Sequence, residues 1–432
     1  MLLNSVILSV IVLCVLCLLR VNVLFSLMIS AIVAGLCAKM PISHIMDLFI
    51  QGMGQNSETA LSYILLGALA AAISHTGLAS ILSIKIGKII KDNKYLLLGV
   101  LIIISILSQN LIPVHIAFIP ILIPPLLSLM NKLKLDRRAV ACSLSFGLKA
   151  PYIALPLGFG LIFQGLIADN MTQNGLQIAK TDIWHYSWIL GFSMFIALLV
   201  AIFISYRHER EYKNIEIETK QEIDTKLERK HYITLLGAVI TLIVQLISGS
   251  LPLGALIGLA VIFGFRAVPH RKMDFLMNEG VILMGYIAFV MLVCAGFALV
   301  LKETQGIELL INSIIPYIQN SKILASLAML LIGLIVTIGI GSSFGTIPIL
   351  AVLFIPLCTK LGFSTPSIVI LLAAAAALGD AGSPASDTTL GPTAGLNADG
   401  QHNHIKDTCI PTFIHYNSAL IIGALIAVYI FG

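Results

Sequence analysis

The sequence is poor in charged residues. Only 11% of its 432 residues are Asp, Glu, Lys or Arg, whereas 58% are hydrophobic. Soluble domains carry about 25% charged residues, so this chain cannot cover a water-exposed surface of its size. Apolar runs long enough to cross a bilayer core about 30 Å thick recur along the chain. We therefore expect an all-α polytopic membrane protein, with the lipid bilayer as a partner.

Other patterns are also missing. None of the seven cysteines forms a CxxC pair beside a histidine or a second CxxC, so neither a disulfide framework nor a structural metal site is expected. No basic stripe with interleaved aromatic residues indicates nucleic acid as a partner. No Asp or Glu lies deep in an apolar segment outside 379–389. An intramembrane aspartyl protease needs a second, facing carboxylate, and we therefore expect no enzyme.

About ten apolar segments are predicted to span the bilayer. They cover residues 2–19, 21–38, 60–76, 139–167, 184–206, 232–248, 252–265, 280–301, 365–398 and 409–431. Two more apolar pairs, 96–130 and 323–360, have polar or Gly/Pro-rich tips without flanking charges. We interpret both as re-entrant hairpins, the alternative being two full crossings each.

Lysine and arginine indicate the orientation of these spans, because cytoplasmic loops collect both residues. With the N-terminus outside, most of them fall on the cytoplasmic side, including the charged segment 207–231. Both termini are then predicted to lie outside. This charge distribution also explains the net charge of +5 without a polyanionic partner.

The second half of the sequence echoes the first. Pro41 to Gly52 resembles Pro269 to Gly280 in its Pro, Met-Asp and Gly residues. An offset of 232 residues then places Gly147 against Gly379. A duplication explains this common order better than chance does.

The duplication predicts two repeats joined by the charged linker 207–231. Residues 1–206 would hold five spans and the hairpin 96–130, rooted in the cytoplasm. Residues 232–432 would hold five spans and the hairpin 323–360, rooted outside. An odd number of crossings inverts the second copy, and inverted repeats with broken helices are a recurrent transporter architecture.

Four segments would break the helices inside the membrane: the hairpin tips at 109–115 and 339–346, and the spans at 147–158 and 379–389. Non-helical backbone survives in a bilayer only where it is buried in protein or lines a cavity. The repeat pairs tip with tip and break with break. We therefore expect all four to converge on one site.

The break at 379–389 is the richest in ligand atoms. A charge at the centre of a bilayer costs about 2.5–3.5 kcal/mol or more and indicates function, and Na⁺ prefers oxygen ligands. The alternative is a polar loop at the membrane surface. The oxygen-bearing residues predicted to bind ion or substrate are Asp380, Ser383, Ser386, Asp387, Thr388 and Thr389, with Na⁺ itself expected at Asp380 and Asp387.

The other three breaks supply further candidates. Lys149 is the one basic residue within a span, and a buried ammonium needs a counter-ion. We expect it to approach Asp380 or Asp387 and to compete with a cation there, unless it extends to the interface. His115 would titrate near neutral pH or only bond a carbonyl. The hairpin tips add polar groups from Asn110, Ser342, Ser343 and Thr346.

Two segments carry a family resemblance. ALSYILLGALAAAISHTGL (60–78) and GDAGSPASDTTLGPTAGLNADGQHNHIKDTCIPTFIHYN (379–417) resemble the NhaC-like Na⁺/H⁺ antiporter family. They are more similar to its bacterial branch of proposed amino-acid transporters. The resemblance implies a secondary transporter of the bacterial inner membrane whose site includes 379–389 and 341–346. Because dimers are common among elevator-type relatives, it also implies a homodimer as one arrangement.

The leading interpretation is a secondary active transporter that moves a small cation against protons by alternating access. The alternative is a Na⁺- or H⁺-coupled transporter of an amino acid such as histidine on the same fold. Na⁺, H⁺ or both are the coupling ions, and no other cofactor is expected. A passive channel fits less well, because inverted broken helices are typical of alternating access.

Overall fold

The computed structural model describes the chain except residues 1–3, 20, 79–80, 82–92, 111–118, 120–121, 214, 216–226, 308, 311, 314–320, 341 and 385. Every regular element in the described part is a helix, which confirms the all-α class. Six described helices are long and apolar enough to cross a membrane, and one bent pair counts as a seventh. Five shorter apolar helices accompany them. The number of ten spans stays a prediction.

The first half of the chain folds into a succession of helices joined by short turns. Its elements are α1 (Ser5–Leu18), α2 (Val23–Cys37), α3 (Ile42–Met53), η1 (Gly54–Asn56), α4 (Ser57–Thr76), α6 (Lys94–Asn110), η2 (Pro124–Leu126), α8 (Leu127–Lys132), α9 (Arg137–Ala154), α10 (Phe159–Gln173), η3 (Lys180–Asp182), α11 (Trp184–Val200) and η4 (Ala201–Ser205).

The second half continues in the same way after the charged segment. Its elements are α12 (Arg229–Ser248), α13 (Leu251–Gly264), η5 (His270–Lys272), α14 (Met273–Glu303), α16 (Lys322–Ile340), α17 (Ser343–Lys360), α18 (Thr365–Ala377), α19 (Asp387–Leu396), η6 (His404–Cys409), α20 (Ile410–Thr412), η7 (Phe413–Asn417) and α21 (Ser418–Phe431).

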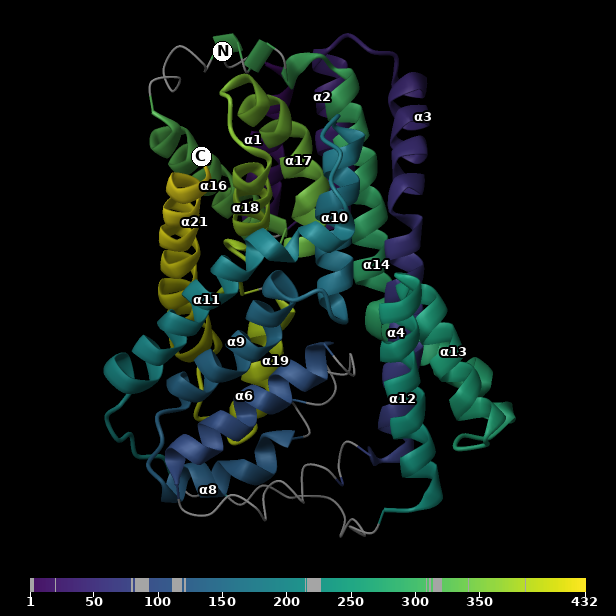
Figure 1. Cartoon of the computed structure of the whole chain (residues 1–432), viewed down its shortest axis with the longest axis vertical. Coiled ribbons are helices and arrows are strands. Elements are labelled where there is room, and N and C mark those ends of the chain that lie inside the picture. The colour runs from purple at the N-terminus through teal and green to yellow at the C-terminus, as the bar shows by residue number, and fades with distance from the viewer. Residues whose placement is uncertain are drawn as a thin grey trace.

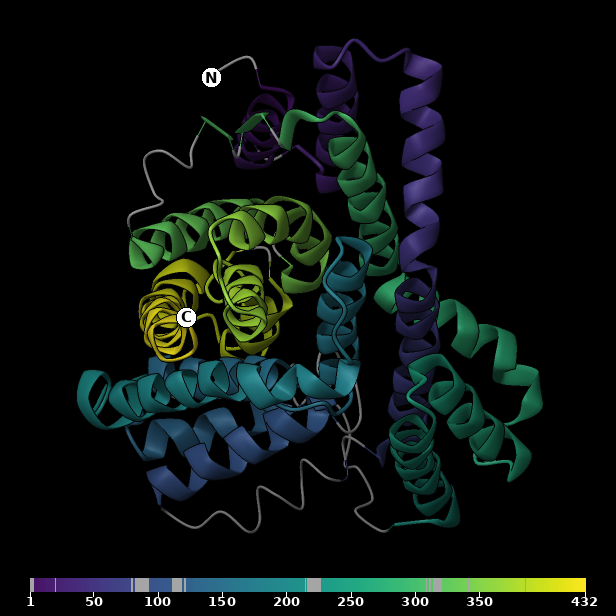
Figure 2. The same cartoon turned by 45° about the horizontal axis from the view of Figure 1, so that its top comes forward.

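A long rod made of α3 and α4 runs along α14 on one side of the molecule (Figure 1). The two rods approach closely where glycines face each other. A Cβ on Gly67 would lie 2.5 Å from the Gly280 carbonyl oxygen, and one on Gly296 would lie 2.6 Å from the Phe49 oxygen. Small residues of this kind let helices in a membrane pack backbone against backbone. In Figure 2 the helices α16 to α21 gather on the side away from this rod.

Three interrupted regions lie within the described chain. The helices α9 and α10 are bent by 45° at residues 155–158, α16 and α17 meet around Ser342, and nine residues separate α18 from α19. The predicted break at Gly147 to Pro151 is wrong at its start, since α9 continues to Ala154. Gly147 instead lets α6 approach, because a Cβ there would collide with Ser105.

The predicted break at 379–389 is also shorter in the structure than expected. Asp387, Thr388 and Thr389 belong to the first turn of α19 and not to the irregular segment before it. Both marked termini lie towards the upper end of Figure 1, and α12 begins at the lower end. The side that faces the cytoplasm and the inverted repeat stay predictions.

Candidate functional site

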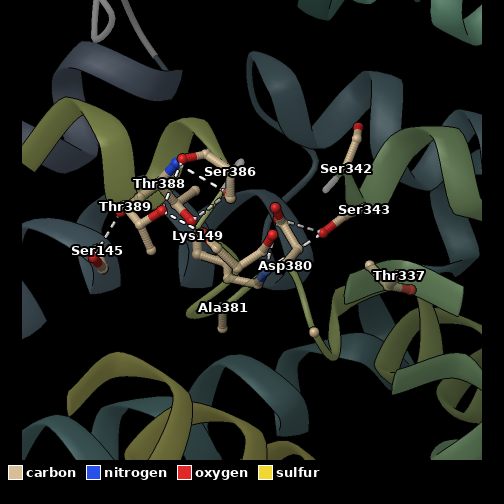
Figure 3. A network of polar contacts seen from close by, with 12 residues as sticks. Ser145, Lys149, Thr337, Ser342, Ser343, Asp380, Ala381, Ser386, Thr388 and Thr389 are labelled. Carbon is tan, nitrogen blue, oxygen red and sulfur yellow. Dashed lines mark hydrogen bonds and ion pairs between the residues drawn. The ribbon is translucent and has the colours of Figure 1, made fainter. Parts of the chain in front are cut away.

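A buried ion pair joins the two halves of the chain. The Lys149 Nζ lies 2.7 Å from the Asp380 Oδ2, and the side chains are 1% and 7% exposed. The Ser343 hydroxyl donates to the same carboxylate oxygen at 2.7 Å, and the Tyr152 hydroxyl donates to it at 3.3 Å. Figure 3 shows Lys149, Asp380 and Ser343 converging from α9, from the segment before α19 and from α17. The predicted approach of Lys149 to Asp380 is thus observed.

The chain around Asp380 passes between other helices at close range. Gly379 and Gly382 have φ values of +81° and +103°, which favour glycine. A Cβ on Gly379 would lie 2.7 Å from the Ile338 nitrogen, and one on Gly382 would lie 2.5 Å from the Phe413 Cβ. Both glycines therefore allow Asp380 to reach the interior.

Asn417 holds the backbone on both sides of Asp380. Its Oδ1 accepts a hydrogen bond from the Gly379 N–H at 3.1 Å, and its Nδ2 donates to the Ala381 carbonyl at 3.0 Å. All three residues are buried. The single side-chain amide thus satisfies a donor and an acceptor that have left the helix, as a buried backbone requires.

We expect Asn417→Ala to lower the free energy of unfolding by about 2–4 kcal/mol, because it leaves two buried backbone groups unpaired. Thermal and denaturant unfolding of the purified protein in detergent measure the change. Asn170→Ala is the matched control, since the one bond of the buried Asn170 amide among the described residues goes to the Leu166 carbonyl one turn earlier. Equal losses in the two variants would contradict this role of Asn417.

Hydroxyl groups fix the segment between Asp380 and α19. The Ser386 Oγ accepts from the Thr388 N–H at 3.1 Å and so caps α19. The Thr389 hydroxyl donates to the carbonyl of Ser383 at 2.5 Å and of Ser386 at 2.9 Å. The Ser145 hydroxyl of α9 donates to the Thr388 carbonyl at 2.7 Å (Figure 3). These bonds set the position of the first turn of α19.

A cavity of about 290 Å³, the central cavity, lies beside the ion pair. Asp380 and Asp387 both line it. Within the described chain no hydrogen bond or ion pair engages the Asp387 carboxylate. The sequence-predicted residues that line the cavity are Ser342, Ser343, Asp380, Ser386, Asp387 and Thr388.

Aromatic side chains form another wall of the central cavity. Tyr63, Tyr152, Phe159 and Phe344 all line it. The Phe344 ring lies at the centre of this group, 5.1 Å from the Tyr152 ring, 5.9 Å from the Phe159 ring and 6.0 Å from the Tyr63 ring between centroids. The cavity therefore offers carboxylates and hydroxyls together with aromatic faces.

The remaining predicted residues lie elsewhere. The Thr346 hydroxyl donates to the Ser342 carbonyl within its own helix at 2.7 Å, and neither Thr346, Ser383 nor Thr389 lines the central cavity. Lys149 reaches the site through Asp380. Asn110 ends α6, but its side chain, like the whole of His115, lies outside the described residues.

Sequence reasoning missed Tyr63, Gln109, Tyr152 and Asn417. Tyr152 follows Lys149 by three residues and therefore shares its helix face, a signal that the sequence contains. Tyr63 and Asn417 lie in the two segments that carry the family resemblance. Gln109 stands beside Asn110 at the first tip, and both Gln109 and Tyr152 line the central cavity.

Comparison with known proteins identifies the family. A model described as the Na⁺/H⁺ antiporter family matches residues 143–428. The chain belongs to the Na⁺/H⁺ antiporter family. A second model, described as a Na⁺-H⁺ antiporter family, matches residues 4–90 of this antiporter-family chain. The sequence resemblance to such antiporters is thereby confirmed.

Relatives of this antiporter-family chain match it over nearly its full length. It is 47% identical to an uncharacterized membrane protein of Vibrio parahaemolyticus, over 98% of this chain and 99% of the relative. It is 44% identical, over the same shares, to a Bacillus subtilis protein named "Putative amino acid transporter YuiF". The antiporter-family chain is a multi-pass membrane protein.

Two solved transporters share the fold. The YdaH transporter of Alcanivorax borkumensis gives a TM-score of 0.62 at 13% identity, over 90% of this chain and 88% of that chain. MtrF of Neisseria gonorrhoeae, described as illuminating a class of antimetabolite efflux pumps, gives 0.60 at 16%, over 90% and 84%. At these identities the likeness concerns the fold alone. Family and fold together identify a transporter and not an enzyme.

Proposed function

We propose that this transporter carries a small zwitterionic solute of amino-acid size, coupled to Na⁺ or H⁺ across the bacterial inner membrane. The observation that supports it best is the central cavity of about 290 Å³, which is lined by aromatic rings and by a carboxylate that has no partner among the described residues. The proposed solute carrier is thus preferred here to cation/proton exchange, whereas the sequence alone favours cation/proton exchange.

The size of the cavity favours an organic solute. A hard cation needs only a close shell of oxygen ligands, so an aromatic wall adds nothing to a site for a cation alone. Pockets for small molecules typically measure about 300–1,000 Å³ and combine apolar walls with a few placed polar groups. The central cavity, at about 290 Å³, lies just below that range, which suits a molecule of amino-acid size.

The charges of the cavity suit a zwitterion. Asp387 would pair with the ammonium group of the solute, because it has no partner in the described chain. The Ser342 hydroxyl and the N-terminal end of α17 would face its carboxylate, since a helix N-terminus favours negative charge. The rings of Tyr63 and Phe344 would contact its side chain.

The Lys149–Asp380 pair supports the coupling of solute transport to Na⁺ or H⁺. It also supports cation/proton exchange as a second candidate function. A proton or Na⁺ at Asp380 would compete with the Lys149 ammonium for the carboxylate. Such competition would link cation binding to a rearrangement beside the central cavity. Without a solute in the cavity, the same competition would perform cation/proton exchange.

Purified protein in liposomes with a luminal pH dye separates these functions. Uptake of a labelled amino acid, histidine first, that depends on a Na⁺ or H⁺ gradient would support the proposed carrier. Proton movement driven by Na⁺ or Li⁺ alone, without uptake of any amino acid, would support the exchanger instead. K⁺ serves as the control cation.

Asp387→Asn is expected to raise the KM for amino-acid uptake about 10- to 100-fold, because a hydrogen bond to a charged group contributes about 1.5–3 kcal/mol. The melting temperature should stay within the error of the wild type, since no described residue loses a bond. Asp274→Asn on α14 is the control, because Asp274 is exposed and lines neither this cavity nor the one described next. A normal KM in Asp387→Asn would remove Asp387 from the site.

A further inference from the structure

A second cavity of about 260 Å³ lies next to the central one. Its walls come from α4, from α10 with the turn before it, from η3 and the start of α11, and from the junction of α12 and α13. Ser62, Pro156 and Ile162 line it, whereas Tyr63 and Phe159 line the central cavity. Adjacent residues of α4, and residues three positions apart around the start of α10, thus face different cavities.

The contact between Tyr63 and Phe159 stands at this boundary. The two ring centroids are 5.5 Å apart, and both rings also contact Phe344 in the first turn of α17. A solute that passed between the cavities at this point would have to displace the Tyr63 and Phe159 rings.

The second cavity carries charges of both signs. Lys180 lies 2.9 Å from Asp169 and both are about half exposed, while Glu58 lines the same space from α4. The side chain of Gln164 is 1% exposed. Its Nε2 donates to the Ile153 carbonyl at 3.3 Å, but its Oε1 has no hydrogen-bond partner in the described chain.

These groups match the two ends of a zwitterion. An ammonium group suits the Glu58 carboxylate and the vacant acceptor of Gln164, and a carboxylate suits Lys180. A buried amide oxygen without a partner is costly unless a ligand or water engages it. The same chemical class of solute therefore fits both cavities.

We propose that the second cavity is an antechamber, which binds the zwitterionic solute before it reaches the central cavity, with the Tyr63–Phe159 contact as the partition between them. This inference rests on the proposed function and adds a second site to it. Binding in the antechamber raises the local concentration of solute beside the Tyr63–Phe159 contact. The antechamber therefore lowers KM, and it leaves kcat, which reports the steps after the solute has reached the central cavity, unchanged.

Lys180→Gln and Gln164→Leu test the antechamber in liposomes, with the labelled amino acid that wild-type protein takes up most. Each should raise KM about five- to tenfold and leave kcat within about twofold. Lys180 is half exposed, so its variant is expected to fold even if Gln164→Leu does not. Gln173→Leu, on the same helix but outside the second cavity, should leave KM unchanged.

Equilibrium binding of the same labelled amino acid gives an independent readout. Asp387→Asn should lose the tighter class of sites and keep a weaker one, and the further change Lys180→Gln should remove the weaker one. Wild-type uptake with unchanged KM in both single variants would overturn the antechamber alone. No uptake of any amino acid by the wild type would overturn the proposed function and the antechamber with it.

Discussion

Asp380→Asn is expected to reduce coupled transport more than 100-fold and to destabilise the protein by about 3–5 kcal/mol, the usual cost of breaking a buried ion pair from one side. The Lys149 side chain is 1% exposed and its ammonium lies 2.7 Å from Asp380. In Asp380→Asn this charge stays buried beside a neutral amide, and its other hydrogen-bond partner in the described chain is the Ser343 hydroxyl at 3.4 Å. Uptake in liposomes and the melting temperature in detergent measure both effects.

The double variant Lys149→Gln/Asp380→Asn separates stability from transport. Two neutral amides of similar volume remove the uncompensated charge, so stability should return towards that of the wild type. Transport should not return, because the Asp380 carboxylate proposed to bind the coupling ion is gone. Full transport with normal pH dependence in Asp380→Asn, or in both Lys149→Gln and Lys149→Ala, would contradict the proposed competition.

The pairing of Lys149 with Asp380 was predictable because isolated charges within apolar spans are rare. A buried charge needs a partner, and the sequence offers only two carboxylates at comparable depth, Asp380 and Asp387. Choosing between them needs the backbone geometry. The turn through Gly379 to Gly382 directs Asp380 to Lys149 and leaves Asp387 at the start of α19.

Other parts of the site follow from packing and not from local pattern. Pro151 looks like a helix breaker, yet α9 runs on to Ala154 and bends only before α10. Gly147 looks like part of a break but is a contact point with α6. Asn417 lies 38 residues from Gly379, and no local pattern distinguishes it from any other polar residue within a span.

Arg137→Met is expected to lower the free energy of unfolding by about 3–5 kcal/mol, because it leaves a buried carboxylate without its cation. The Arg137 guanidinium makes a two-pronged contact with Asp399, at 2.7 Å and 2.5 Å, and donates to the Leu396 carbonyl at 2.9 Å. These bonds join the start of α9 to the end of α19. The side chains of Arg137 and Asp399 are 0% and 2% exposed.

A nearby exposed pair gives a control for Arg137. Lys134 pairs with Glu211, and the two side chains are 48% and 79% exposed. Exposed pairs contribute only about 0–1 kcal/mol, so Lys134→Met should change stability little. Burial would raise the pKa of Asp399, but hydrogen bonds and charge from Arg137 outweigh it and hold the pKa below its ordinary value. The contribution of Asp399 is therefore present at neutral pH and is lost as the pH falls below about 4. The two variants should differ in melting temperature at pH 7, and equal values there would show that the buried contact does not hold α9 to α19.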